Sequence, residues 1–433
     1  MVRILTQGAS PRLTYTLELL FKQLLGLDYE IVAGERESLS PGNAWINYTP
    51  GYIRGMMNIH PHDLLFERGI RDVQVAATKW GDIPVLFPVS KRADMPFDPL
   101  AMIFYLVSRY EEYHDRERDK HGRFRPEDSL AFRHGFLDVP VINRLAGKIL
   151  KELTAMFPGK LNGRSAPYCF VPTIDVDIAY AHLSKGWLRQ LGGYGKLLLK
   201  GKAGEMLQRS GTLLGLQKDP YDNFAFQDAV FDKHGVKAIY FFLLGDHGRN
   251  DKNASWENPR FRKLIRRTAE KHALGIHPSY RSYDEPGRIR METSRLAEIT
   301  GKEVTRGRLH FLRMRFPGTY RELAAAGIRD DYSMGYASRT GFRAGISTPF
   351  YFYDIPAEKA TSLRVHPFAF MDTTLSDYLS LSPSEYLTFV KPMVREVKKN
   401  GGELTAIWHN YALAADPLKH RAFEDMIKLC AYA

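Results

Sequence analysis

The chain has only two cysteines, Cys169 and Cys430, among its 433 residues. Two cysteines cannot build the disulfide framework of a small secreted domain, so a reducing compartment is the simpler interpretation. Long apolar runs are missing as well. The stretch from Leu17 to Leu27 is interrupted by charged and amide side chains, and it falls short of the roughly 20 residues that span a bilayer. The sequence therefore argues against an integral membrane protein.

Two N-terminal features are also absent. Residues Met1 to Gln7 lack the basic start and the continuous apolar core of a secretory signal. Together with the cysteine content, this predicts a cytoplasmic protein in a bacterial source. Gly8 follows a strand-like run, but no GxGxxG or phosphate-binding loop accompanies it, so no nucleotide site is expected there.

The composition supplies a large core and an excess of positive charge. Apolar residues make up 44% of the chain and aromatic residues 12%, and the formal net charge is +12. Such a charge favours an anionic partner, which can be a nucleic acid, an anionic glycan, a lipid phosphate or a membrane surface. No nucleic-acid recognition motif accompanies the basic residues, so a nucleic acid is not expected.

The length exceeds that of one ordinary core, and the patterning divides the chain into three parts. We expect a small α/β domain over 1–95, a helical connecting segment over 96–164 and a larger domain over 165–433. Asp98 and Pro99 provide the cap and first turn of a helix expected to reach Tyr113. In the larger domain, strand and helix alternate, which predicts parallel strands with right-handed crossovers and a distorted (β/α) barrel of about seven strands.

Two charged stretches stand apart from this alternation. The residues of 109–114 and 119–123 are expected to neutralise one another at a domain junction. The insertion 182–218 interleaves leucines with basic residues, which predicts a basic amphipathic lid over a pocket, with peripheral membrane contact as a further use. A surface hairpin without a ligand is the alternative. The basic residues are Lys185, Arg189, Lys196, Lys200, Lys202, Arg209 and Lys218.

The most informative stretch is 171–177, a short apolar strand that ends on Asp175 and Asp177. Residues two apart in a strand project to the same side, so both carboxylates can address one pocket. Two later apolar runs end on His277 and His409, and a third carries His310. If these strands are neighbours, their carboxyl ends converge on one site. The pattern predicts a hydrolase metal centre.

These motifs resemble, in order, those of the polysaccharide deacetylases, the NodB-like esterases of carbohydrate esterase family four. The resemblance covers about 167–411 and rests on Thr173–Asp177, His277–Ser279 and Trp408–Asn410. The first domain resembles an N-terminal extension found on some Bacteroidetes-type members. The resemblance implies a distorted barrel that hydrolyses N-acetyl or O-acetyl groups with a divalent metal, usually zinc, with cobalt and nickel as alternatives.

The resemblance also implies a role for each matching residue. Asp175 is the general base, Asp177 and His277 are metal ligands, and His409 is the general acid that protonates the departing group. General chemistry agrees with this division, because one carboxylate must bind the metal while the other removes a proton from the attacking water. A histidine that titrates near neutrality suits the proton donor.

The sequence departs from the family pattern in two places. Arg281 stands four residues after His277, where the family has a second histidine, and an arginine does not ligate metals. His310, expected on a neighbouring strand over 308–314, is the replacement ligand. The Arg-x-Pro motif is also missing, which leaves Arg308 or Arg313 to orient Asp175, and we select Arg313. A backbone N–H near residues 311–312 is expected to face the oxyanion.

The predicted function is removal of an acetyl group from an acetylated carbohydrate, either anionic or lipid-linked, during assembly of a bacterial surface polysaccharide. Two alternatives remain open at this stage. A barrel without catalytic activity could bind glycans, which the missing histidine makes credible. A nucleotide-sugar glycosyltransferase could use Asp175 and Asp177 to hold Mn²⁺ and a diphosphate, although that interpretation gives the histidines no role.

Overall fold

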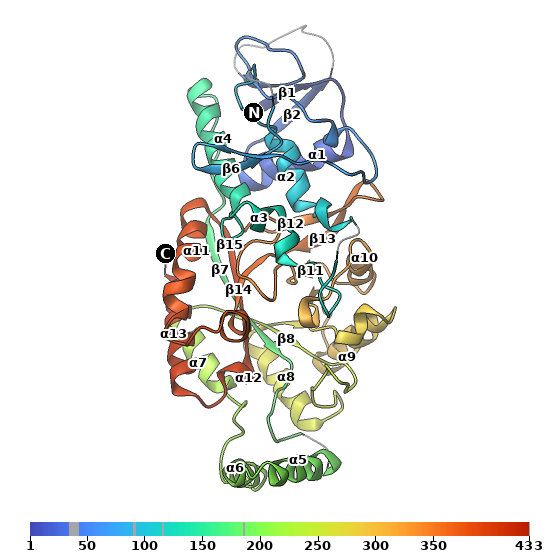
Figure 1. The fold of residues 1–433 in the computed structure, drawn as a ribbon, viewed down its shortest axis with the longest axis vertical. Helices are drawn as coiled ribbons and strands as arrows, with labels where there is room; N and C mark the ends of the chain where they lie inside the picture. Colours follow the sequence, from blue (N-terminus) through green and yellow to red (C-terminus); the bar gives the residue numbers. More distant parts are fainter. Residues whose placement is uncertain (34–42, 90–91, 115–116, 185–186, 433) are drawn as a thin grey trace.

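The computed structural model describes residues 1–33, 43–89, 92–114, 117–184 and 187–432. The molecule is elongated (Figure 1). A small sheet lies at one end, a helical hairpin lies at the opposite end, and a large curled sheet with its helices lies between them. No helix in the described ranges has both the length and the apolar character needed to cross a bilayer.

The first sheet contains four parallel strands in the order β2-β1-β3-β4. Their bounds are β1 Val2–Thr6, β2 Tyr29–Ala33, β3 Ala44–Tyr48 and β4 Met57–Asn58. Helix α1 spans Pro11–Leu17 and continues as the π-helix η1 over Glu18–Leu24, with its leucines buried against the sheet. An antiparallel hairpin follows, formed by β5 Ala77–Trp80 and β6 Ile83–Leu86.

The connecting segment is helical, as predicted. Asp98 caps α2 (Pro99–Val107) by accepting hydrogen bonds from the N–H groups of Leu100 and Ala101, at 2.9 and 3.1 Å. The helix ends earlier than predicted, because Arg109 adopts a left-handed conformation with φ 54° that a helix cannot contain. The short helix α3 and the long helix α4 complete the segment, at Leu130–Arg133 and Val141–Met156.

The large sheet has nine strands in the order β12-β13-β11-β10-β9-β8-β7-β15-β14. All neighbours are parallel except β12 and β13. The sheet curls into a half-barrel, which confirms the predicted α/β class and distorted barrel with two strands more than expected. The strands are β7 Tyr168–Val176, β8 Ile239–Phe242, β9 Ala273–Ile276, β10 Arg306–Gly307, β11 Asp330–Asp331, β12 Phe350–Asp354, β13 Lys359–Val365, β14 Phe368–Met371 and β15 Gly402–His409.

Helices flank this sheet in the alternation that the sequence predicts. Their bounds are α7 Phe224–His234, α8 Pro259–Lys271, α9 Arg288–Thr300, α10 Gly318–Ala325, α11 Tyr386–Asn400, α12 Asn410–Leu413 and α13 Pro417–Ala431. The predicted strand over 308–314 is wrong. The chain leaves β10 after Gly307 and turns through the 3-10 helix η6 (His310–Leu312), where Phe311 and Leu312 have φ of 59° and 55°. Left-handed residues cannot extend a strand.

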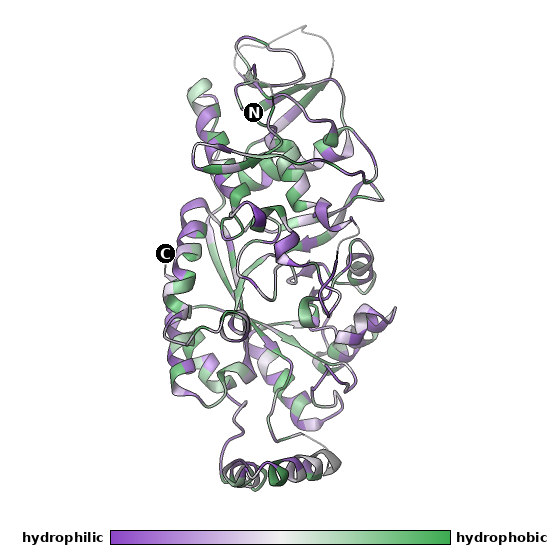
Figure 2. Ribbon diagram, in the orientation of Figure 1, coloured by the Kyte–Doolittle hydropathy of each residue, from purple (hydrophilic) through white to green (hydrophobic). Residues whose placement is uncertain are grey.

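One hydrophobic cluster runs through both sheets, from Val2 to Cys430. Figure 2 shows apolar residues along α2 and the large sheet, whereas the outer helix α9 is largely hydrophilic. Buried ion pairs cross the same junction. Arg12 binds Glu358, with Nε and Oε2 3.0 Å apart, and the fully buried Arg343 binds Glu112. Arg109 pairs with Glu111 and Glu112 at 2.9 and 2.8 Å, so the charges of 109–114 satisfy one another as predicted, with Arg343 as a further partner.

The insertion forms a hairpin of two helices, α5 Trp187–Leu199 and α6 Ala203–Leu213. Lys185 and the side chain of Arg189, both in the predicted basic set, lie outside the described part of the chain. Asp219 fixes the base of the hairpin, because its carboxylate accepts hydrogen bonds from the N–H groups of residues 181–183 at 2.7–2.9 Å. The hairpin begins ten residues after Asp177, at the end of β7.

Candidate metal centre

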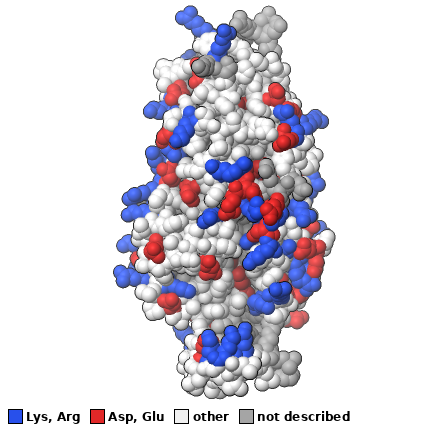
Figure 3. All heavy atoms as spheres, in the orientation of Figure 1, with Lys and Arg blue, Asp and Glu red and all other residues white. Residues whose placement is uncertain are grey.

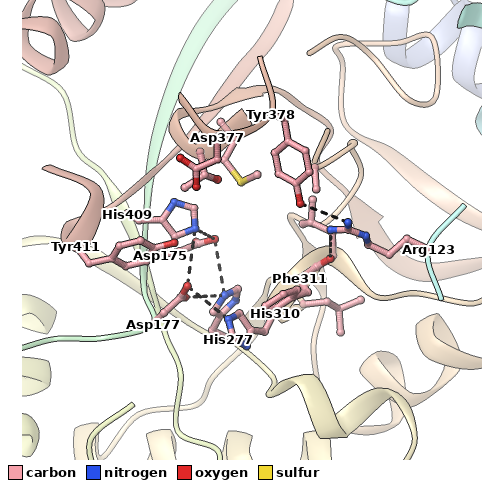
Figure 4. Close-up of a pocket in the computed structure, with 15 residues that line it drawn as sticks. Arg123, Asp175, Asp177, His277, His310, Phe311, Asp377, Tyr378, His409 and Tyr411 are labelled. Carbon is pink, nitrogen blue, oxygen red and sulfur yellow. Dashed lines mark hydrogen bonds and ion pairs between the residues drawn. The ribbon is translucent and has the colours of Figure 1, made fainter. Parts of the chain in front are cut away.

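The carboxyl ends of three strands bring the predicted site residues together (Figure 4). β7 carries Asp175 and is followed by Asp177, β9 is followed by His277, and β15 ends on His409. Because β15 is the direct neighbour of β7, His409 stands beside Asp175 in the register. His310 follows β10, which pairs with β9 through Gly307 and Ile276. The prediction that neighbouring strands place these side chains together is therefore confirmed.

Asp177, His277 and His310 form a buried cluster. One ligand atom from each lies within 4.8 Å of the others. The Nε2 atom of His277 is 3.2 Å from Asp177 Oδ1, and the Nε2 atom of His310 is 3.4 Å from Asp177 Oδ2. Burial raises the pKa of Asp177, but the nearby imidazoles, His310 first, lower it by more. The pKa of Asp177 therefore lies well below its ordinary value.

The outer hydrogen bonds of both imidazoles fit a cation at this position. His277 Nδ1 contacts the backbone oxygen of Arg308, and His310 Nδ1 lies 3.0 Å from Asp251 Oδ1. Because these oxygens only accept, Nδ1 carries a proton in both rings, and Nε2 is the nitrogen that faces Asp177 and can bind a metal when it is unprotonated. Two imidazole nitrogens and a carboxylate that face one another need a cation between them, which is either a proton or a metal ion.

Two further observations support this fit. Asp177 Oδ1 is buried and has no hydrogen-bond partner of suitable geometry, although His277 is near. Burial lowers the pKa of His310, but the carboxylates of Asp177 and Asp251 outweigh burial and raise it to about 9. Positive charge is thus favoured at the centre of the cluster, whether a proton or a metal supplies it.

Arg308, rather than Arg313, contacts Asp175. The fully buried Arg308 donates from Nη1 to Asp175 Oδ1 at 2.9 Å and to the hydroxyl of Thr173 at 2.7 Å. Its Nε also donates to the backbone oxygen of Tyr332. Arg308 directly follows β10, and its side chain extends to Asp175 on β7.

The selection of Arg313 is therefore corrected. Arg313 lies beyond the turn of η6, where its guanidinium stacks between Tyr280 and Tyr283 at 4.0 and 4.1 Å from the ring centroids. It donates from Nη1 to Asp284 at 3.0 Å. The turn at 310–312 redirects the chain, which is why the expected strand geometry failed for this residue.

Asp372 holds His409, and the sequence analysis missed it. Asp372 Oδ1 is 2.7 Å from His409 Nδ1, while Oδ2 accepts the backbone N–H of the same residue at 2.7 Å. Burial lowers the pKa of His409, but Asp372 first, and then Asp177 and Asp175, raise it to about 10. Asp372 follows the apolar run of β14, so the rule that selected Asp175 could have found it.

A cavity of about 210 Å³ opens over the cluster. Its wall includes residues that the sequence analysis did not select, among them Arg123, Tyr378 and Tyr411. Arg123 pairs with Asp119 at 2.7 Å, as expected for the junction, but it also donates to the backbone oxygen of Phe311 at 3.2 Å. The connecting segment therefore contributes directly to the wall of the site.

Other expectations for this region are corrected. The described residues of 182–218 do not line the cavity, and the hairpin lies at the far end of the molecule, so the predicted lid is wrong. Arg281 points away and pairs with Glu285 at 2.8 Å. The N–H of Leu312 donates to Leu309 at 2.9 Å and so does not face an oxyanion, whereas the same expectation for the N–H of Phe311 stays a prediction.

One protein-family model matches the N-terminal part of the chain. Residues 2–158 match a family of unknown function, DUF7033. No curated protein matches the chain.

Solved structures with a similar fold are polysaccharide deacetylases and their relatives. A putative polysaccharide deacetylase from Mycobacterium smegmatis is 16% identical, covers 63% of this chain and 87% of its own, and has a TM-score of 0.42. The catalytic domain of a peptidoglycan N-acetylglucosamine deacetylase from Eubacterium rectale is 13% identical. The match covers 62% of this chain and 85% of the deacetylase chain, with a TM-score of 0.27. A CE4 family pseudoenzyme from Bacillus anthracis is 14% identical. The match covers 61% of this chain and 60% of the pseudoenzyme chain, with a TM-score of 0.25. These scores are low, so the function has to be argued from the site.

Proposed function

We propose that the chain is a metal-dependent hydrolase that removes an acetyl group from an N- or O-acetylated carbohydrate. The observation that carries the proposal is the buried cluster of Asp177, His277 and His310, placed beside a second carboxylate and a third imidazole in one cavity. A structural ion pair does not need this arrangement, whereas metal-assisted hydrolysis of an amide or ester uses a Lewis acid, a base and an acid together.

Asp177, His277 and His310 are the proposed ligands, and a divalent transition metal bound there, with zinc as our first choice, would polarise the acetyl carbonyl and acidify a water. Two imidazoles and one carboxylate leave a further position open, as in catalytic zinc sites. His310 takes the place of the histidine that Arg281 replaces.

Asp175 is the proposed general base. Arg308 occupies its Oδ1, which leaves Oδ2 directed to the cavity at 3.8 Å from His277 Nε2 and 4.0 Å from His409 Nε2. Fixing one oxygen prevents the carboxylate from rotating, so the other oxygen is held ready to accept a proton from water. Asp175 is only 3% exposed, which keeps bulk water from competing for it.

His409 is the proposed general acid. Asp372 holds Nδ1, so Nε2 is the ring nitrogen that faces the cavity and can donate a proton to the departing amine or alcohol. The aromatic side chains of Phe311, Tyr378 and Tyr411 line the same cavity and offer flat surfaces for a sugar ring.

The decisive experiment is elemental analysis of protein purified without chelator or a metal-binding tag, combined with an assay of acetate release. We expect about one equivalent of metal in the wild type and its loss in Asp177→Ala, His277→Ala and His310→Ala. His134→Ala is the control, because His134 is an exposed histidine outside the site. N-acetylglucosamine oligosaccharides and O-acetylated xylan are the first substrates.

Each result has a distinct meaning. A wild type that stays free of metal after reconstitution with zinc contradicts the proposal. Stoichiometric metal without acetate release from any acetylated glycan contradicts the hydrolase assignment and favours a glycan-binding barrel. Loss of metal in His134→Ala would show that the measured ion binds elsewhere.

A further inference from the structure

The α5–α6 hairpin exposes leucines to a degree that the rest of the described chain does not match. Leu199 is 89% exposed, Leu216 is 80% exposed and Leu207 is 75% exposed. Leu191, Leu198 and Leu214 each exceed 60%. Isolated exposed leucines are ordinary, but a group of them on one small element marks an interaction surface.

Packing within the hairpin does not account for these leucines. The two helices contact each other through polar and aromatic groups: Tyr194 and Ser210 share a hydrogen bond of 2.8 Å, and Arg209 stacks on Tyr194 with its guanidinium 5.1 Å from the ring centroid. Arg209 also donates from Nε to Gln190 at 3.1 Å. On α5, Leu191 and Leu198 lie on the same side of the helix as Tyr194, but they are 61% and 69% exposed, so the contact with α6 leaves most of their surface uncovered.

Basic side chains surround the leucines. The sequence from 187 to 218 contains six Lys or Arg residues and one acidic residue, Glu205. Lys196 on α5 and Lys200, which directly follows this helix, are exposed, and Figure 3 shows basic side chains gathered on the hairpin at the lower end of the molecule. Lysines beside leucines on an amphipathic helix are typical of helices that lie in the headgroup region of an anionic bilayer.

We propose that the α5–α6 hairpin docks the protein onto an anionic phospholipid surface, with its leucines in the headgroup and acyl boundary and its lysines on the phosphates. The charge of the hairpin favours a lipid surface over a second copy of the chain as its partner. Two copies would bring two strongly basic hairpins against each other, whereas lipid phosphates neutralise the basic side chains. The thirteen residues of α5 extend about 20 Å, which suits lying on a bilayer and not crossing it.

The attachment of the hairpin fits such a role. The carboxylate of Asp219 binds the N–H groups of Ala181, His182 and Leu183, so both connecting segments are joined at the base. The hairpin therefore projects from the end of the molecule opposite the first sheet in a fixed direction (Figure 1). This surface is independent of the proposed hydrolysis, because no described residue of the hairpin lines the cavity.

The test is co-sedimentation of the full chain with vesicles of phosphatidylcholine alone and with added phosphatidylglycerol, without any substrate. We expect at least tenfold tighter binding to the anionic vesicles at 0.1 M salt and a loss of that preference at 1 M salt, where the Debye length falls from about 10 to about 3 Å.

Two pairs of variants separate charge from apolar contact. Lys196→Glu/Lys200→Glu should lower the affinity for anionic vesicles at least tenfold, whereas Lys391→Glu/Lys399→Glu, at two exposed lysines of α11, should leave it within twofold. Leu199→Ser/Leu207→Ser should also lower it tenfold, while Leu418→Ser, at a 69% exposed leucine of α13, should not. Unchanged thermal unfolding of each variant shows that the fold is intact.

Three outcomes overturn the proposal. The first is equal or absent binding of the wild type to both kinds of vesicle. The second is wild-type binding by both hairpin variants. The third is a dimer in light scattering that the leucine substitutions dissociate, without any vesicle binding, because a second copy of the chain would then cover the leucines. Acetate release need not be measured, so failure here leaves the proposed hydrolase untouched.

Discussion

Asp372 binds His409 through two hydrogen bonds of 2.7 Å, from the ring nitrogen Nδ1 to Oδ1 and from the backbone N–H to Oδ2. The two bonds fix the tautomer and the direction of the ring at the same time, so Nε2 can only face the cavity. The same design recurs at His310, whose Nδ1 is bound by Asp251. Each imidazole of the site is therefore oriented from behind by an oxygen acceptor.

Replacing Asp372 with asparagine should impair the proposed proton donor while leaving the cluster in place. We expect kcat to fall by roughly 10²–10⁴-fold, the usual contribution of general acid catalysis. A general acid works only when protonated, so activity falls as pH rises through its pKa. Asp372 raises the pKa of His409, so the alkaline fall should begin at lower pH in Asp372→Asn. An unshifted pH profile contradicts this role, and Asp425→Asn on α13 is the control.

Asp251→Asn should weaken metal binding. Asp251 accepts from the Nδ1–H of His310 and also from the backbone N–H of Tyr280 at 2.8 Å, and substitution of such outer partners commonly costs 10–100-fold in affinity. Competition with a chelator of known affinity measures the change. Asp232→Asn, on the exposed face of α7, should match the wild type, and equal affinity in both variants would show that Asp251 does not support His310.

Arg308 and Arg313 should differ sharply when each becomes lysine. Arg308→Lys removes the planar group that fixes Asp175 and Thr173, so we expect kcat to fall at least 100-fold, with metal retained. Arg313→Lys removes ring stacking, an ion pair with Asp284 and hydrogen bonds to two backbone oxygens, none of which involves Asp175, so kcat should stay within about tenfold of the wild type. Equal losses would contradict the assignment of Arg308. Thermal unfolding of both variants separates a catalytic loss from misfolding.

Glu112 should make the stability of the protein depend on pH in the acid range. Burial raises its pKa, but Arg343 and Arg109 outweigh burial and lower it to about 2, from an ordinary value of 4.5. A lowered folded-state pKa stabilises the fold above pH 4.5, and this contribution is lost as pH falls from about 4.5 to about 2. Urea unfolding across this range should show the loss in the wild type.

Glu112→Gln removes that titration and leaves the buried guanidinium group of Arg343 without a counter-charge, while Arg109 keeps its pair with Glu111. We expect the variant to lose about 3–5 kcal/mol at pH 7, as for other broken buried pairs, and to show a weaker dependence on pH between about 4.5 and 2. Glu117→Gln, at an exposed residue, should retain the wild-type curve. An unchanged slope in Glu112→Gln would mean that another carboxylate dominates acid unfolding.

Much of the fold could be predicted from strong local patterns in the sequence. The cap at Asp98 placed the start of α2, the alternation of strand and helix predicted the α/β architecture, and apolar strands ending on Asp175 and His409 identified one edge of a parallel sheet. The end of α2 and the turn at 310–312 could not be predicted in this way, because left-handed Arg109 and Phe311 are held there by tertiary contacts and not by a local preference.

The residues that support the site were harder to find than those that form it. Asp372 ends an apolar run and was open to the same reasoning as Asp175. Asp251 lies in a loop after β8 with no flanking pattern, and its role depends on a contact with His310, 59 residues later. Arg123 is farther still, 188 residues before its partner Phe311. Contacts of this range are set by the tertiary arrangement of loops and the connecting segment around the large sheet, which no single window of sequence contains.

Arg123 makes the wall of the cavity depend on the connecting segment. A segment of 165–433 alone would keep every proposed ligand, base and acid, but the cavity would lose the guanidinium that the connecting segment supplies through its contact with Phe311. A chimaera that joins this barrel to another N-terminal half would thus inherit the chemistry from one parent and part of the selectivity from the other.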